Sequence, residues 1–109
     1  AFAVFEGANM PLTPEAISAV QEAGLLYTPG KASNAGGVAT SGLEMSQNSI
    51  RMSWSFEEVD EKLKGIMKKI FEACLAASIE CGKPGDMMLG ANVAGFLKVA
   101  DAMMAQGIV

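Results

Sequence analysis

The pattern of apolar and polar positions in the first part of the chain predicts a strand, a helix and a second strand. Residues 1–5 are all apolar, which is typical of a parallel strand buried on both faces. Thr13 is a favoured helix cap and Pro14 a favoured first helical residue, so we expect a helix to begin there. Gly24 is suited to end this helix, and residues 25–28 form a second short apolar run. This order of elements is the signature of a βαβ unit.

The rest of the chain has the periodicity of helices. Apolar side chains recur at helical spacing over residues 38–52, after a glycine-rich stretch, and over residues 55–81. Ser55 and Glu58 match the capping box that begins many helices. The sequence therefore predicts an α/β fold in which a βαβ unit is followed by long helices.

A last helix is expected over residues 90–106, where apolar side chains share one face. Residues 90–95 contain two glycines and one asparagine, and they admit two interpretations. They form either a hinge or the first turn of the helix, with Asn92 as its cap.

The composition excludes several kinds of function. Half of the residues are hydrophobic, which rules out intrinsic disorder. Eight lysines and arginines stand against twelve aspartates and glutamates, and a net charge of −4 disfavours a nucleic-acid partner. The chain has no histidine, so its own residues provide neither imidazole catalysis nor a histidine-ligated metal site. We expect no metal site.

The two cysteines and the apolar segments indicate in which cellular compartment the protein is expected. Cys74 and Cys81 form no CxxC motif, and on one helix they lie about 10 Å apart along the axis, too far for a disulfide. Free thiols favour a reducing compartment. The chain shows no signal peptide, and the apolar run at 87–97 is too short to span a bilayer. We therefore expect no membrane partner. Because residue 1 already lies in a strand-like run, we also expect the chain to be a fragment of a longer protein.

Two polar stretches are candidates for ligand binding. Asn9 follows the first strand, at the edge of a parallel sheet where ligands of α/β folds bind, and its amide suits a ribose or a carboxamide. From the pattern alone, an Asx turn that only ends the strand is the favoured interpretation of Asn9. Asn34 and Ser41 flank a glycine-rich helix start that would let a ligand approach free N–H groups. Close packing of a helix on a strand is the alternative there.

Five motifs, in order over nearly the whole chain, carry a resemblance to a known family. They are Glu6-Gly7-Ala8-Asn9-Met10-Pro11, Pro29-Gly30-Lys31-Ala32, Asn34-Ala35-Gly36-Gly37-Val38, Ser41-Gly42-Leu43-Glu44-Met45-Ser46-Gln47-Asn48-Ser49 and Gly90-Ala91-Asn92-Val93-Ala94-Gly95-Phe96. In these motifs the chain resembles the carboxyl-terminal part of hexameric glutamate dehydrogenase, of the small-subunit type.

The resemblance implies an oxidoreductase of amino-acid metabolism and nitrogen assimilation. Such an enzyme reversibly deaminates L-glutamate to 2-oxoglutarate and ammonia with a nicotinamide cofactor, with NADP favoured over NAD. It also implies a cytoplasmic homo-hexamer. Residues 1–52 would be the end of a Rossmann-like cofactor domain with a substrate-contacting helix, and residues 53–109 would be helices that pack back toward the substrate domain.

The resemblance assigns roles to three side chains. Asn9 corresponds to an asparagine near the nicotinamide ribose, and Asn34 to one that meets both nicotinamide and substrate. Ser41 corresponds to the serine that binds the distal carboxylate of glutamate. The catalytic lysine and aspartate of the family are expected upstream of residue 1, so the chain alone is expected to be inactive.

A different class of function competes with the enzyme. The long helices could instead form a non-catalytic interaction or oligomerisation module that docks a partner. The two hypotheses differ in one structural expectation: the enzyme requires Asn9, Asn34 and Ser41 to border one site, whereas the module does not.

Overall fold

The predicted βαβ unit is present in the computed structural model, which describes residues 1–107. Strand β1 (Ala3–Phe5) pairs in parallel with β2 (Leu26–Thr28), with Val4 opposite Tyr27. Helix α1 (Pro14–Glu22) connects them. Each strand has only three residues, and these two strands form the whole sheet of the described part of the chain.

Helix α1 begins where the sequence predicts. The hydroxyl of Thr13 accepts a hydrogen bond from the Ala16 backbone N–H at 3.3 Å, and Pro14 occupies the first turn. Gly24, with a φ of +69°, takes the left-handed conformation that turns the chain into β2. Both ends of α1 are therefore set by residue types that are recognisable in the sequence.

The next helical segment begins earlier than expected. A short helix α2 (Gly30–Ser33) follows β2, and α3 (Ala35–Ile50) then starts ahead of the glycine pair, not after it. Asn34 is the junction, because it ends α2 and precedes α3. Gly36 is tolerated inside α3 because it lies against α4, with the Met67 sulfur 3.6 Å from the position a Cβ would take.

Helix α4 (Phe56–Glu80) confirms the predicted capping box. The Ser55 hydroxyl accepts from the Glu58 N–H at 3.2 Å, and the Glu58 carboxylate accepts from the Ser55 N–H at 2.7 Å. At its far end, Cys74 is buried and Cys81 exposed, and both are free thiols as expected.

Helix α5 (Met87–Gln106) corrects the prediction for the last segment. Its cap is Asp86, whose carboxylate accepts from the Leu89 N–H at 3.0 Å, so the alternative with Asn92 as cap is wrong. A carboxylate at the start of a helix accepts a hydrogen bond from a free backbone N–H, and its negative charge is stabilised by the positive end of the helix dipole. Asn92 instead accepts a hydrogen bond from the Lys31 ammonium.

The length of α5 also differs from the apolar run that we considered. The helix has 20 residues and so extends beyond the apolar run at 87–97. Lys98 and Asp101 interrupt the apolar sequence, but they do not end the helix. In residues 1–107 it is the one helix whose length and composition would allow it to cross a membrane. Core helices of soluble proteins pass the same test, so the absence of a membrane partner stays a prediction.

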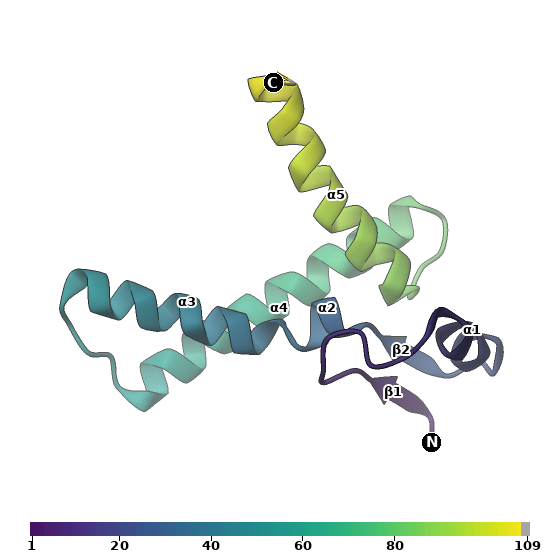
Figure 1. The fold of residues 1–109 in the computed structure, drawn as a ribbon, viewed down its shortest axis with the longest axis horizontal. Helices are drawn as coiled ribbons and strands as arrows, with labels where there is room; N and C mark the ends of the chain where they lie inside the picture. The colour runs from purple at the N-terminus through teal and green to yellow at the C-terminus, as the bar shows by residue number, and fades with distance from the viewer. Residues whose placement is uncertain (108–109) are drawn as a thin grey trace.

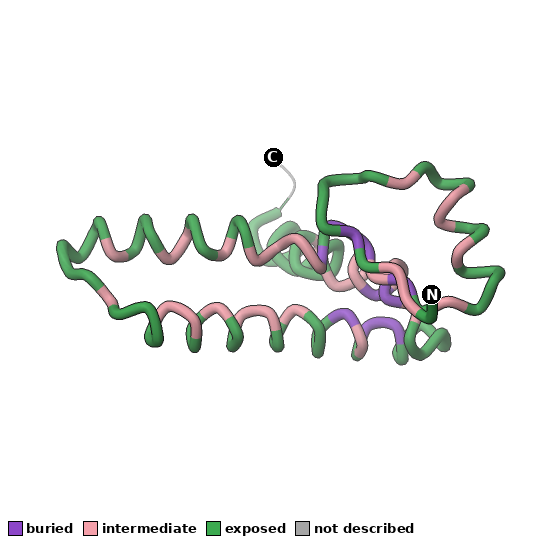
Figure 2. Tube along the Cα trace, turned by 90° about the horizontal axis from the view of Figure 1, so that it is seen from below, coloured by how far each residue is buried: buried purple, intermediate pink, exposed green. Residues whose placement is uncertain are grey.

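The helices spread away from the small sheet instead of enclosing it. Helices α3 and α4 form an antiparallel hairpin that extends to one side, α1 lies on the opposite side, and α5 projects outward (Figure 1). Buried residues are confined to the region where the sheet, α2, the second half of α4 and the start of α5 meet (Figure 2). Ala32, Cys74 and Met87 form the core cluster there.

Candidate functional site

The polar end of the parallel sheet forms a cavity of about 280 Å³. It is lined by Glu6 and Asn9, which follow β1, and by Gly30 and Lys31, which follow β2. Tyr27, the central residue of β2, also lines it, and apolar side chains of the Asn9 turn, α1 and α5 make up most of the remaining wall. This location is the one that ligands of α/β proteins use, because the carboxyl ends of parallel strands and the turns after them meet there.

Glu6 is the buried acidic residue of this cavity, with 6% of its surface exposed. One carboxylate oxygen accepts a hydrogen bond from the Gly30 backbone N–H at 2.6 Å. The Glu6 backbone carbonyl accepts from the Ser33 hydroxyl, and its backbone N–H donates to the Thr28 carbonyl at 3.1 Å. Glu6 therefore links the turn after β1 to the turn and helix after β2.

Two buried polar atoms of the cavity have no hydrogen-bond partner among the described residues. They are the second carboxylate oxygen of Glu6 and the hydroxyl of Tyr27. Burial, together with the neighbouring Glu6 carboxylate, raises the pKa of Tyr27 to about 12. The phenol therefore remains protonated at neutral pH and can donate a hydrogen bond.

Gly30 is required by the close approach of the two turns. A Cβ at this position would lie 2.3 Å from the Ala8 carbonyl oxygen and 3.2 Å from the Glu6 carboxylate. No other residue fits without moving the backbone of the Asn9 turn.

The three predicted site residues fall into two groups. Asn9 is exposed and lines the cavity, whereas Asn34, the residue before α3, and Ser41, on α3, lie outside it. The seven-residue separation of Asn34 and Ser41 corresponds to about two helical turns, or about 10 Å along a helix axis. Ser41 is exposed, and its hydroxyl donates a hydrogen bond to the Gly37 carbonyl at 3.3 Å. A ligand in contact with Asn9, Asn34 and Ser41 would therefore have to extend from the cavity to α3.

Sequence analysis predicted Asn9 as a ligand-binding residue but did not predict the other residues that form the cavity. Glu6, Tyr27 and Gly30 come from two segments that meet only in the folded chain. One signal was available for Glu6: an acidic residue directly after an apolar strand is costly to bury unless it is paired.

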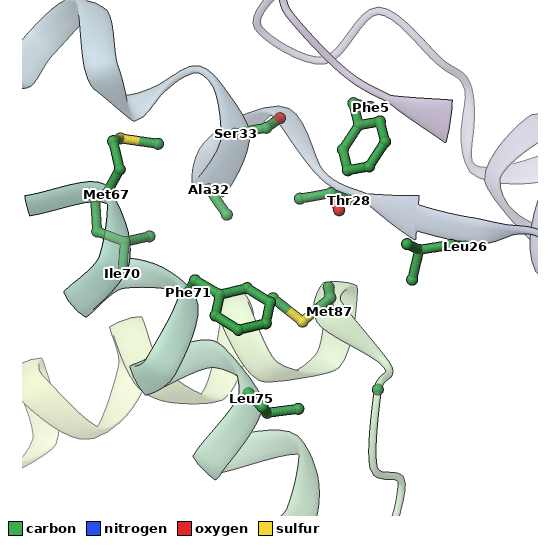
Figure 3. Close-up of a pocket in the computed structure, with 11 residues that line it drawn as sticks. Phe5, Leu26, Thr28, Ala32, Ser33, Met67, Ile70, Phe71, Leu75 and Met87 are labelled. Atoms are coloured by element: carbon green, nitrogen blue, oxygen red, sulfur yellow. The ribbon is translucent and has the colours of Figure 1, made fainter. Parts of the chain in front are cut away.

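A second cavity, of about 370 Å³, is apolar and lies between the sheet and α4. Figure 3 shows Phe5 and Leu26 of the sheet on one side of it, with Phe71 and Leu75 of α4 on the other. Apart from Ser33 and Thr28 its wall offers no polar side chain, so it has no group that could perform acid–base chemistry.

Comparison with known proteins gives the family. The family model for Glutamate/Leucine/Phenylalanine/Valine dehydrogenase matches residues 1–107. The chain belongs to this family. It is 66% identical over 107 residues to a glutamate dehydrogenase of Bacteroides thetaiotaomicron and 57% identical to an NADP-specific glutamate dehydrogenase of Escherichia coli. Each alignment covers 98% of this chain but only 24% of the relative.

Solved structures of the family share the fold of the chain. A glutamate dehydrogenase of Plasmodium falciparum superposes with a TM-score of 0.91 at 50% identity, over 97% of this chain and 23% of that one. A glutamate dehydrogenase of Peptoniphilus asaccharolyticus superposes with a TM-score of 0.88 at 31% identity, over 98% of this chain and 27% of that one. The chain therefore spans about a quarter of the length of its relatives.

Proposed function

We propose that the chain is the carboxyl-terminal part of an NADP-using glutamate dehydrogenase. The whole enzyme interconverts L-glutamate with 2-oxoglutarate and ammonia. The observation that carries this proposal is the identity of 57–66% to glutamate dehydrogenases, two of them named NADP-specific, over nearly all of the chain. We favour NADP over NAD as the cofactor because these two relatives are named NADP-specific.

The domain assignment follows from the same proposal. Residues 1–52 are the end of a Rossmann-like cofactor domain, and residues 53–109 are helices that return toward the substrate domain. The parallel pair β1–β2 with α1 between its strands supports the first part. The assignment for residues 108–109 lies outside the described residues.

The cavity at the carboxyl end of the sheet, which combines an apolar wall with a few polar groups, fits a role in holding part of a nicotinamide cofactor. Glu6 and Tyr27 offer buried polar atoms that have no partner within residues 1–107. The cofactor, when bound, supplies the hydride acceptor for glutamate oxidation. We assign Asn9 to the ribose beside the nicotinamide, Asn34 to the nicotinamide and substrate side, and Ser41 to the distal carboxylate of glutamate. The catalytic lysine and aspartate belong to the other three-quarters of the subunit.

The assembly is proposed to be a cytoplasmic homo-hexamer active in nitrogen assimilation. Large apolar side chains on the surface support burial against further protein: Phe2 is 85% exposed and Phe96 is 68% exposed. Free cysteines support a reducing compartment.

An activity assay on the full-length enzyme tests the proposed function. We expect reduced nicotinamide to form when glutamate and NADP are both supplied, and to be consumed when 2-oxoglutarate, ammonia and reduced NADP are supplied. Leucine, phenylalanine and valine are the matched alternative substrates, since the family model includes dehydrogenases of all three. Turnover of one of these in place of glutamate would reject the substrate, and no turnover at all would favour the interaction module.

A further inference from the structure

The contacts of Glu6 connect the two segments that carry the proposed site asparagines. Asn9 follows Glu6 by three residues in the turn after β1, and Asn34 directly follows Ser33 at the end of α2. The Glu6 side chain binds the first N–H of α2 and its carbonyl binds the Ser33 hydroxyl. One residue thus holds both ends of α2 to the Asn9 turn.

This junction leaves little freedom for the two turns to shift. The Gly30 N–H and a Glu6 carboxylate oxygen are joined by a 2.6 Å bond, which is the short distance of a bond to a charged acceptor. The missing Cβ of Gly30 leaves room for the Ala8 carbonyl, immediately before Asn9. Pro29, ahead of Gly30, is fully buried and has a fixed φ, so the start of α2 is held from both sides.

We propose that Glu6 is a positioning residue, whose buried carboxylate sets the distance between the Asn9 turn and Asn34 and so aligns cofactor with substrate. The proposal rests on the proposed function for the roles of the two asparagines. Glu6 itself is assigned no proton transfer. Its effect comes from geometry, because a displacement of about 1 Å at a reacting centre can cost on the order of a hundred-fold in rate.

Substitutions at Glu6 in the full-length enzyme test the proposal. Glu6→Ala removes the acceptor for the Gly30 N–H, and we expect kcat/KM for glutamate to fall by roughly ten- to a hundred-fold. Glu6→Gln retains a carbonyl acceptor of the same length, and we expect it to restore most of that loss. Glu6→Asp, shorter by one methylene, should be intermediate, and it replaces Glu6→Ala in the comparison if the alanine variant does not fold.

A matched control separates positioning from general stability. Ser78 is also buried, near the end of α4 and outside the cavity that Glu6 lines. Its hydroxyl donates a hydrogen bond to the Leu75 carbonyl and accepts one from the Gly85 N–H. We expect Ser78→Ala to lower the unfolding temperature while kcat and KM stay at wild type. Equal losses of kcat/KM in Ser78→Ala and Glu6→Ala would overturn the proposal, as would a glutamine variant as damaged as the alanine variant.

A second measurement does not depend on activity. Hydrogen exchange of peptides covering residues 26–34 should be roughly ten-fold faster in Glu6→Ala than in wild type, because a bond to a charged group is lost, and unchanged in Ser78→Ala. Wild-type exchange in Glu6→Ala would refute the positioning role even if the enzyme is active. Absence of glutamate oxidation in the wild-type enzyme would instead refute the proposed function, and the exchange data would still decide whether Glu6 holds the two turns together.

Discussion

Single residues determine the structure of the cavity at the carboxyl end of the sheet. Glu6 is a buried acidic residue, and its side chain is stabilised by a hydrogen bond that the Gly30 backbone N–H donates at 2.6 Å. Tyr27 lies beside it with its hydroxyl unpaired among residues 1–107. The sequence alone indicated Asn9 as the polar residue of this turn, whereas the structure adds Glu6 and Tyr27, which become neighbours only when β1 and β2 pair.

Replacing Ser41 tests the proposed contact with the distal carboxylate of glutamate. In the full-length enzyme we expect Ser41→Ala to weaken glutamate binding by about 1.5–3 kcal/mol, the value of a hydrogen bond to a charged group, with little change in NADP binding. Ser46→Ala is the matched control, because Ser46 is an exposed serine of the same helix that also bonds the carbonyl four residues back. A wild-type KM for glutamate in Ser41→Ala would reject the assignment.

The ionisation of Tyr27 predicts how stability responds to alkaline pH. The phenol pKa is 10.0 when unperturbed and about 12 in the fold, so between these values the unfolded chain loses this proton and the folded chain keeps it. The free energy of unfolding should therefore decrease as pH rises through this window and show no contribution from Tyr27 below it.

Tyr27→Phe removes this titration and provides the comparison. We expect the difference between the urea midpoints of wild type and Tyr27→Phe to stay constant up to pH 10.0 and to change above it in favour of the variant, because only the wild type carries the titrating phenol. Parallel decreases of the two midpoints with pH would contradict the raised pKa.

At the level of the elements, helix ends were predictable where a local bond defines them. Thr13 and Ser55 cap α1 and α4 with bonds to residues three positions away, so the relevant partners are visible in the sequence. The start of α5 was missed because the glycines at 90–95 suggested an irregular segment. In the structure Gly90 is helical and packs against the backbone of α4, which no local pattern reveals.

The crossing of α4 and α5 depends on Gly90. A Cβ there would lie 2.0 Å from the Cys74 carbonyl oxygen, a backbone atom that cannot move without displacing α4. We expect Gly90→Ala to destabilise the fold by about 2 kcal/mol or more, measured as the change in free energy of unfolding in urea.

Gly95→Ala on the same helix is the control for this substitution. A Cβ at Gly95 meets no atom within 4 Å, so the change should stabilise α5 by up to about 1 kcal/mol through helix propensity. Similar effects of the two substitutions would mean that helix propensity, not the close crossing, determines the cost at position 90.

At the level of the whole molecule, the chain exposes more surface than an independent domain of its size. Its accessible surface is 7771 Å², against about 5,700 Å² expected for a folded monomer of 11.3 kDa. Its radius of gyration is 16.4 Å, against about 13 Å for a compact domain of this length. Both differences fit a chain whose apolar faces pack against the remainder of a larger subunit.

We therefore expect the isolated 109-residue chain to self-associate or to be marginally stable. The two strands of the sheet have open edges, and large apolar side chains such as Phe2 and Met104 are more than four-fifths exposed. Light scattering of the purified chain measures this directly. A monodisperse monomer with a cooperative unfolding transition would contradict the expectation.

The amino-acid sequence was sufficient for features that depend on neighbours along the chain or on a long shared motif. These include the βαβ order, the caps of α1 and α4, and membership of the dehydrogenase family. Other features required the folded chain, because they arise between segments far apart in sequence: the bond from Gly30 to Glu6, the unpaired Tyr27 hydroxyl and the approach of Gly90 to Cys74. Periodicity reports which face of a helix is buried, but not which backbone atom will lie opposite it.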